Sequence, residues 1–432
     1  MVFSLNQGKD TIFSVRIFAY LAISSFLTLM RRFLLPFFLL CIWTGCGRVS
    51  LPFDPAEAVV INEDCDLMAH CSCFVPGGAG TVYFAYYRDS TQTLENPGKT
   101  TITPVLAKAT GLREGRPGEG LSVSFGSIVR QEIIHTGESV GTFTQSPARA
   151  PYDPNLLLLG DTLMVYFVGC VDGIVTTCVR RYDIRSDSFA DEVEICTLSY
   201  DGKTLPFDTR SVFDLYEARG IAATYNNDLL MSGAFVPYKG EWYCAVGTAF
   251  QPRSCPVVVK TADGVHFDAV MVCSEFLYGC AEASVAVWKD DFYVIMRNSG
   301  VERGGRGCYV ARYDASGRCL VGPVYLSEAQ SKPAIALHKG RMYLFYNANP
   351  FLQTEWGLVS RSRLRISEID RDCRILRSWD ITDPYGIHYP YVREMDGRLW
   401  MSFTEDRKQL DVNQTRTNIS FTPVRLPPPF SK

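Results

Sequence analysis

Four polar residues stand at the same place in a repeated sequence pattern, each eight residues before a Gly or Asp turn: Asp153, Glu282, Lys332 and Tyr389. A tyrosine with a carboxylate neighbour can attack an anomeric carbon, because the carboxylate draws off the phenolic proton. A second carboxylic acid can protonate the leaving oxygen of a glycoside. These residue types therefore indicate glycoside chemistry, provided that the fold brings them together.

The repeated pattern occurs six times and consists of a short apolar strand, a Gly or Asp turn and an aromatic-rich apolar strand. The copies begin at His70, Pro151, Met231, Cys280, Ser331 and His388. Strand-only repeats indicate a radial β-architecture, because one hairpin cannot bury its own apolar face. The segments between the copies supply further hairpins with polar turns. We therefore predict an all-β fold, a six-bladed β-propeller with four-stranded antiparallel blades.

The two ends of such a ring must meet, since an open sheet edge would be a liability. Residues 57–62 or the C-terminal segment 418–426 are expected to complete the last blade. The spacing of the turns predicts long insertions in the first two blades and four compact blades after them.

The position eight residues before each turn forms a column, which is occupied by Ser72, Asp153, Ser232, Glu282, Lys332 and Tyr389. The first strand of each propeller blade faces the central channel, so this column should ring one mouth of it. Antiparallel partners equidistant from a turn lie side by side, which places Arg297 beside Glu282 and brings Arg88 and Asp89 near the same rim. Such a polar concave mouth is the default candidate site, and its planar guanidinium groups suit a substrate carboxylate.

Several of these segments resemble the sialidase family. GCAEASVAVWKDDFYVIMRNSG resembles the family pattern of a Glu, an apolar strand, a turn and an Arg, which matches Glu282 and Arg297. HYPYVREMDGRLWMSFTED is similar to the segment that carries the nucleophilic tyrosine, which matches Tyr389. RSRLRIS resembles the segment with the last substrate-binding arginine, here Arg361, and TADGVHF at 261–267 resembles a shortened Asp-box turn between outer strands.

The resemblance implies an exported, exo-acting glycosidase without a cofactor, acting on a terminal acidic or modified sugar. It also implies an acid/base aspartate after the second strand of blade one, where Asp89 is the candidate and Glu95 the reserve, while the repeat column offers Asp153 instead. The family's first blade opens with Arg-Ile-Pro, whereas this chain has His-Cys-Ser-Cys from His70. Lys332 is the candidate for the missing charge.

Two alternatives to this function remain at the level of the sequence. The first is a non-catalytic surface propeller that binds glycan or protein, which the absent first-blade arginine favours. The second is a glycoside hydrolase with two catalytic carboxylates, Asp153 and Glu282, of the arabinofuranosidase- or xylosidase-like kind.

The N-terminal region predicts export. Met30 is followed by two arginines, the apolar run FLLPFFLLCIW and a Thr-Gly-Cys-Gly ending that resembles a bacterial lipobox with Cys46 as the lipidated residue. We therefore expect residues 1–29 to be upstream sequence translated in error, 30–46 to be a lipoprotein-type signal peptide and 47–432 to be the propeller. The expected location is the bacterial cell envelope, through the lipid anchor alone, or outside the cell. A signal anchor made of both apolar runs is the alternative.

The composition of the chain indicates which classes of partner to expect. The chain has 432 residues, 21% of them charged, and a formal charge of -3, with scattered Lys and Arg, so the basic footprint of a nucleic-acid-binding protein is missing. We expect a monomer with a carbohydrate partner. The 15 cysteines do not have metal-site spacing, so no metal is expected, and Cys170 with Cys178 and Cys273 with Cys280 are candidate disulfides.

Overall fold

The computed structural model describes residues 51–91, 101–115, 123–248, 254–276, 279–298, 307–329, 331–348, 352–354, 357–359, 361–382, 386–408 and 415–426. The chain divides into two compact units, residues 1–50 and 51–432. The predicted upstream extension, the signal peptide and Cys46 therefore lie outside the described residues, as does Glu95. Among the described residues, no helix is long and apolar enough to cross a membrane.

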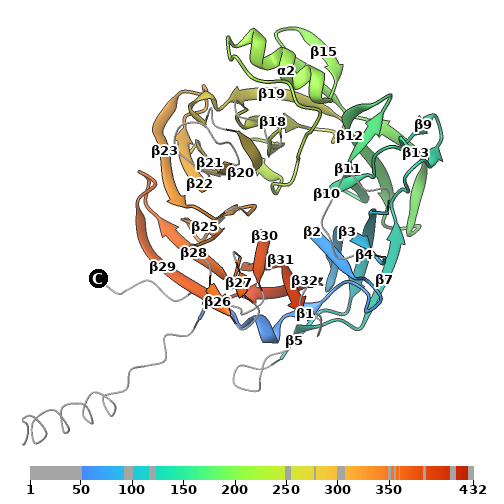
Figure 1. Ribbon diagram of the computed structural model, residues 1–432, viewed down its shortest axis with the longest axis vertical. Coiled ribbons are helices and arrows are strands. Elements are labelled where there is room, and N and C mark those ends of the chain that lie inside the picture. Colours follow the sequence, from blue (N-terminus) through green and yellow to red (C-terminus); the bar gives the residue numbers. More distant parts are fainter. Residues whose placement is uncertain are drawn as a thin grey trace, which may run out of the picture. The chain divides into compact units, whose positions relative to one another are not determined.

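Residues 51–432 fold into six blades around a central channel (Figure 1). The first two blades, from the channel outward, consist of β2 (Met68–Gly78), β3 (Thr81–Asp89), β4 (Thr103–Thr110) and β7 (Ser127–Glu132), then β10 (Tyr152–Leu159), β11 (Thr162–Val171), β12 (Ile174–Asp183) and β13 (Ser188–Ile195). The third consists of β16 (Val236–Tyr238), β17 (Glu241–Val246), β18 (Val257–Thr261) and β19 (His266–Val272).

The remaining blades repeat this order. They consist of β20 (Cys280–Trp288), β21 (Asp291–Asn298), β22 (Gly307–Tyr313) and β23 (Cys319–Ser327), of β24 (Ala334–His338), β25 (Arg341–Asn347), β28 (Arg363–Ile369) and β29 (Ile375–Thr382), and of β30 (Ile387–Met395), β31 (Arg398–Lys408), β32 (Thr415–Val424) and β1 (Val59–Val60). The predicted six-bladed propeller is thus confirmed.

The ring closes because the two ends of this unit share one blade. The early strand β1 pairs antiparallel with the late strand β32, with Val59 opposite Phe421. The inner strands β30 and β2 then lie against each other across the closure. Both segments that were expected to complete the last blade therefore contribute to it.

The insertions lie where the turn spacing predicts them. Around the first two blades are the short hairpins β5 (Arg113–Glu114) with β6 (Val123–Ser124) and β8 (Ser139–Val140) with β9 (Phe143–Thr144). After the second blade, β14 (Thr197–Tyr200) and β15 (Lys203–Pro206) widen the third blade to six strands, because β14 pairs parallel with β19. The helix α2 (Thr209–Ala218) follows, capped at its start by the Asp208 carboxylate, which accepts from the Ser211 N–H.

Three short elements complete the fold: η1 (Pro55–Glu57), η2 (Ser274–Phe276) and the hairpin of β26 (Leu352–Thr354) with β27 (Gly357–Val359). The Asp-box-like segment forms the turn between β18 and β19, the outer strands of blade three. There the Asp263 carboxylate accepts from the Val265 N–H at 2.8 Å.

The 13 described cysteines are free thiols, which corrects the two candidate disulfides. Cys170 and Cys178 lie on neighbouring strands, but Cys178 is opposite Phe167 and Cys170 is opposite Val175. Most of the thiols are buried and pack as small apolar groups.

Candidate active site

Three inner strands leave regular strand geometry at one end of the channel. Cys71, Asp153 and Tyr389 have φ angles of 52°, 47° and 54°, whereas every other described non-glycine residue with positive φ lies in a turn or bend between strands. Each of the three sits in a β-bulge, where the pairing register slips. Such backbone strain is uncommon away from turns and gathers at functional sites.

The fourth bulge lies in β20, between Cys280 and Ala283, where Ala281 and Glu282 together oppose Arg297. A bulge re-aims side chains that would otherwise alternate across the sheet. The four bulged strands come from blades one, two, four and six, and a residue of each bulge lines the same cavity: Cys71, Asp153, Glu282 and Tyr389.

These bulges surround a cavity of about 210 Å³, which is lined by Cys71, Tyr87, Tyr152, Asp153, Asp228, Leu230, Glu282, Arg297, Arg361 and Tyr389. The cavity is smaller than the roughly 300–1,000 Å³ of sites for drug-sized ligands, so it suits one terminal ring rather than a chain of rings. Three of the four predicted catalytic residues and two of the four predicted substrate-binding residues line it.

Tyr389 is in contact with a base and a cation. Its Oη donates to Glu282 Oε1 at 3.0 Å and accepts from Arg297 Nη1 at 2.9 Å. The same Arg297 nitrogen donates to Glu282 Oε1 and Oε2 at 3.0 and 3.2 Å. All three side chains are buried, and the guanidinium offsets the cost of burying the carboxylate. A phenolate formed at Tyr389 would also be stabilised by that guanidinium.

The ring of Tyr389 is positioned by its neighbours. Its centroid lies 4.2 Å from that of the His70 ring, and the guanidinium carbon of Arg361 lies 5.1 Å from it. Arg361 is in turn held by a short chain of polar contacts, from its Nη1 to His388 Nδ1 at 3.4 Å and from His388 Nε2 to Asp406 Oδ1 at 2.8 Å. Burial lowers the pKa of His388, so a neutral imidazole donates to Asp406 and accepts from Arg361.

Asp153 faces the same cavity as a weak acid. Burial raises its pKa to about 7, although the nearby charge of Lys332 opposes the shift and Glu282 adds to it. Its Oδ2 has no hydrogen-bond partner within the described part of the chain. A carboxyl group with this pKa is partly protonated near neutral pH, so it can give a proton and take it back.

Asp228 is a lining residue that the sequence analysis missed. It accepts hydrogen bonds from Tyr152 Oη, from the Leu229 N–H at 3.0 Å and from Arg149 Nη2 at 3.2 Å, and burial raises its pKa. It lies before the third copy of the repeat, so the column does not include it. Its position just ahead of an apolar run was the available signal.

Two glycines let blade four approach blade three at the bulge. A Cβ at Gly233 would lie 2.6 Å from the Ala283 carbonyl oxygen, and one at Gly247 would clash with the Ala281 carbonyl oxygen. These carbonyls flank Glu282. The two glycines therefore set the position of the Glu282 backbone.

In blade one, the position eight residues before the turn is not the residue that lines the cavity, and the prediction is wrong by one residue. A further bulge between Pro76 and Gly78 shifts the count, so Cys71 lines the cavity and the Ser72 hydroxyl bonds to Ser402 Oγ at 2.9 Å instead. Ser232 and Lys332 lie before β16 and β24 begin and are absent from the described lining. Lys332 is buried, with its Nζ 5.4 Å from the centre of the Tyr391 ring. Its positive charge acts to lower the pKa of Asp153.

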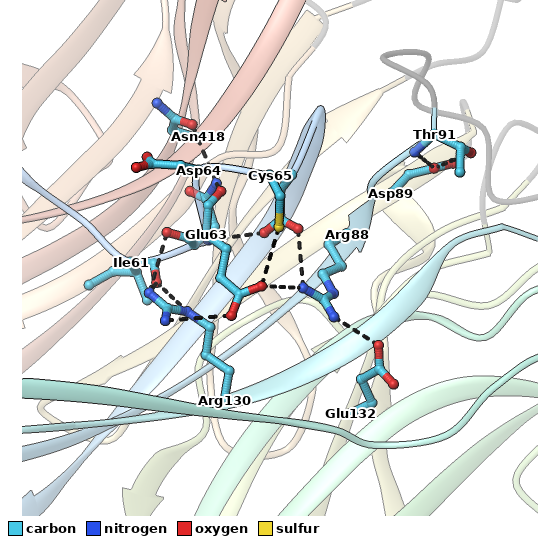
Figure 2. Close-up of polar contacts among 12 residues, drawn as sticks. Ile61, Glu63, Asp64, Cys65, Arg88, Asp89, Thr91, Arg130, Glu132 and Asn418 are labelled. Carbon is cyan, nitrogen blue, oxygen red and sulfur yellow. Dashed lines mark hydrogen bonds and ion pairs between the residues drawn. The ribbon is translucent and has the colours of Figure 1, made fainter.

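Arg88 and Asp89, at the end of β3, are absent from the described cavity lining. Figure 2 shows Arg88 directed toward Glu63 and Glu132, and Asp89 beside Thr91. Arg88 forms ion pairs with Glu63 at 2.8 Å, Asp66 at 3.2 Å and Glu132 at 2.8 Å, because it alternates with the cavity-facing Tyr87. Arg88 is thus absent from the described cavity lining, and its substrate-binding role stays a prediction. Its guanidinium contacts both carboxylates of the Glu63–Cys65–Asp66 group, so that group is an ion-pair cluster.

Asp89 accepts from the Thr91 N–H and hydroxyl at 2.8 and 2.7 Å and from the Thr101 hydroxyl at 2.6 Å. These bonds hold the carboxylate at the start of the following loop. Its role as the acid/base stays a prediction, and the described aspartates with a raised pKa in the cavity are Asp153 and Asp228.

Comparisons with known proteins identify the fold. No protein-family model and no curated protein matches the sequence. In structure, the chain is similar to the Trypanosoma rangeli sialidase in complex with the inhibitor DANA, with a TM-score of 0.53 and 14% identity over 86% of this chain and 58% of that one. A protein of unknown function from Dyadobacter fermentans is similar with a TM-score of 0.52 and 15% identity, over 85% of this chain and 98% of that one. For the intramolecular trans-sialidase from Ruminococcus gnavus the TM-score is 0.50 and the identity 11%, over 87% of this chain and 99% of that one.

The chain thus spans somewhat more than half of the Trypanosoma sialidase, which has a further part outside the match. At 11 to 15% identity these similarities show the fold alone. The chain has a divergent, sialidase-like six-bladed propeller.

Proposed function

We propose that the protein is an exo-acting glycosidase that removes a terminal, acidic or modified sugar from a glycan, with Tyr389 as the nucleophile. The observation that carries the proposal is the contact of Tyr389 Oη with both Glu282 and Arg297 at the cavity. A solved sialidase of the same fold holds sialic acid, which supports a glycan ligand. The proposed enzyme is an exported monomer, anchored in a bacterial envelope through Cys46 or secreted.

In the proposed first step, Glu282 takes the phenolic proton while Tyr389 Oη bonds to the anomeric carbon. The bond from that carbon to the leaving oxygen breaks, and Asp153 gives the oxygen its proton. Arg297 stabilises the negative charge on the phenolic oxygen through the bond that it already makes there.

In the proposed second step, Asp153 takes a proton from water, which attacks the anomeric carbon. The bond to Tyr389 breaks and Glu282 returns the phenolic proton. Two displacements at one carbon retain the anomeric configuration. Arg361, above the Tyr389 ring, is the guanidinium that we assign to an acidic group of the sugar.

Turnover of a fluorogenic sialoside and of a panel of aryl glycosides, by the wild type and Tyr389→Phe, tests the proposal. We expect one of these substrates to turn over and Tyr389→Phe to lose about 10³-fold or more of kcat. Tyr325→Phe, at an exposed tyrosine of an outer strand, is the control and should stay near wild type. Full activity in Tyr389→Phe would rule out the tyrosine nucleophile.

The same assay separates the alternatives. Glu282 and Asp153 both line the cavity, as a two-carboxylate hydrolase would require. Activity that persists in Tyr389→Phe and is lost in Glu282→Gln would support that alternative. In the Tyr389–Glu282–Arg297 group the charges of Glu282 and Arg297 neutralise each other without a substrate. If no substrate turns over and a glycan still binds, the protein is a glycan-binding propeller.

A further inference from the structure

The cavity around Tyr389 contains a second group of a tyrosine, a carboxylate and an arginine. Tyr152 Oη donates to Asp228 Oδ1, and Arg149 Nη2 donates to Tyr152 Oη at 2.9 Å and to Asp228 Oδ1 at 3.2 Å. The guanidinium carbon of Arg149 also lies 5.1 Å from the centre of the Tyr152 ring. Tyr152 belongs to blade two, and Asp228 comes just before blade three. The cavity wall thus has two such groups, and the second comes from the blades that do not carry Tyr389 and Glu282.

The two groups differ in how many carboxylate oxygens they use. Arg297 bonds to both oxygens of Glu282. Asp228 instead accepts three bonds on Oδ1 alone, the third from the Leu229 N–H at 3.0 Å, and its Oδ2 has no partner among the described residues. The Asp228 side chain lines the cavity, is 13% exposed and does not have its Oδ2 among the enclosed, unbonded atoms. This oxygen is therefore open to a ligand in the cavity.

The backbone on both sides of Asp228 is fixed to the neighbouring blades. Before it, Asn227 Nδ2 donates to the carbonyl oxygen of Gly173, in the turn between β11 and β12, at 2.7 Å. After it, Leu230 exchanges two backbone hydrogen bonds with Gly247, of 2.8 and 3.0 Å. An acceptor held in this way loses little conformational freedom when a ligand binds, which favours a specific contact.

The balance of charges indicates which kind of donor the open oxygen suits. Arg149 pairs with Asp228 at 3.2 Å, as Arg297 pairs with Glu282 at 3.0 Å. The negative charge of Asp228 is therefore already compensated, which favours a neutral hydroxyl group over an ammonium group as the donor.

We propose that Asp228 is a specificity-determining residue, whose Oδ2 accepts a hydrogen bond from one hydroxyl group of the terminal sugar. This inference rests on the proposed glycosidase function and names a part of the sugar that the cavity recognises. Because the anomeric carbon reacts at Tyr389, the hydroxyl group is on another carbon of the ring. A sugar without that hydroxyl group, or with an acyl group on it, leaves Asp228 Oδ2 without a donor and loses binding free energy.

Kinetics with monodeoxy analogues test this role. The parent is the glycoside of the panel with the highest kcat/KM, and each analogue lacks one hydroxyl group. We expect one analogue to lose about 10- to 100-fold of the wild-type kcat/KM, the value of a hydrogen bond to a charged group. Asp228→Asn keeps an oxygen for the three bonded donors and replaces the open acceptor by an NH₂ group. In this variant the parent should fall to about the level of that analogue, and the analogue should change little.

The matched control is Asp201→Asn, which removes a carboxylate that is paired with Arg219 on the exposed part of the insertion after blade two. It should leave the parent and every analogue unchanged. Tyr152→Phe keeps the Asp228 carboxylate but removes one of its three donors, so it should reduce the same discrimination by a smaller factor. If Asp228→Asn does not fold, unchanged discrimination in Tyr152→Phe refutes the proposal.

The outcomes separate this inference from the proposed function. Equal wild-type rates for the parent and all analogues, or undiminished discrimination in Asp228→Asn, would refute the role of Asp228 and leave the glycosidase intact. If no glycoside turns over, the proposed function fails, and calorimetric titration of wild type and Asp228→Asn with the free sugars of the panel replaces the kinetics. A sugar that binds only the wild type would then support the contact, and the absence of binding by every sugar would overturn it.

Discussion

The two ends of the central channel are built from the same inner strands and carry opposite chemistry. On β20, Glu282 belongs to the polar cavity and Val287, five residues or about 16 Å further along, to an apolar recess of about 370 Å³ between blades three, four, five and six. On β30 the corresponding pair is Tyr389 and Val392. The polar end has four β-bulges and three strained residues, whereas the strands are regular where they line the apolar end.

This difference has a physical reason. A regular strand sends alternate side chains to the channel, and apolar residues fill that position well. A buried carboxylate or phenol must instead be aimed at a partner, and the bulges allow such aiming. The polar end should therefore be sensitive to the loss of single atoms, and the apolar end should respond mainly to volume.

The largest effect is expected at the acid of the polar end. Asp153→Asn removes the proton donor and should lower kcat by about 10²- to 10⁴-fold, as is typical for general acid–base groups. The kinetics of hydrolysis measure this loss. Asp161→Asn, at the turn of the same hairpin, should leave kcat unchanged, and equal rates for wild type and Asp153→Asn would remove Asp153 from the mechanism.

In the wild type, the pH dependence of activity and of stability should reflect the raised pKa of Asp153. Its folded-state pKa of about 7 means that activity requiring the protonated acid falls as the pH rises through 7. Its unfolded-state pKa is near 3.8, so between these values the folded state binds the extra proton and stability declines with rising pH. Thermal unfolding from pH 4 to 8 should show this decline in the wild type and a smaller one in Asp153→Asn.

The next effect concerns the buried ion pair. Arg297→Met leaves the Glu282 carboxylate buried without its cation and should destabilise the fold by about 3–5 kcal/mol. Adding Glu282→Gln should recover part of this. Arg393→Met at the apolar end should cost less, because its described hydrogen-bond partners, the Phe235 carbonyl and the Tyr391 hydroxyl, carry no charge. Denaturant unfolding compares the variants, and similar costs at both ends would contradict the contrast between them.

A smaller effect is expected at Gly247, one of the two glycines that let blade four approach blade three. Gly247→Ala places a Cβ against the Ala281 carbonyl and should cost about 1–3 kcal/mol by overpacking. The displaced Glu282 should also lower kcat, by up to about 10²-fold. Gly322→Ala in the outer strand of blade four meets open space and is the matched control. Normal stability and rate in Gly247→Ala would mean that this contact does not set the position of Glu282.

The smallest effect is expected from volume at the apolar end. Ala336→Val extends into the recess and should stabilise the fold by about 0.5–1 kcal/mol. The same change at the tightly enclosed Ala281, beside the polar bulge, should destabilise it. Chemical denaturation of both variants measures the difference, whose reversal would contradict the assignment of the two ends.

Much of the polar end could be predicted from the sequence. The six repeats supplied a register, and that register brought Asp153, Glu282 and Tyr389 to one mouth. Arg297 was expected beside Glu282 and is bonded to it. These predictions succeeded because a hairpin of known turn and length places its residues by counting alone.

Counting failed where the backbone departs from the regular strand. The bulge at Gly77 moved Cys71 into the place expected for Ser72. Ser232 and Lys332 precede β16 and β24 and are absent from the described lining, and in blade three Leu230, opposite Gly247, lines the cavity. Arg88 is absent from the described lining because strand alternation directs it away from Tyr87, toward three carboxylates that hold it. Asp228 was missed because it lies outside the repeat.

The sequence by itself determined the blade count, the hairpin register and the residue types at the polar mouth, since these follow from periodicity and turn chemistry. Only the tertiary structure decided which residues meet across blades. The contact of Tyr389 with Glu282 and the raised pKa of Asp153 depend on burial and on neighbours distant in sequence. Local patterns carry no record of such long-range contacts.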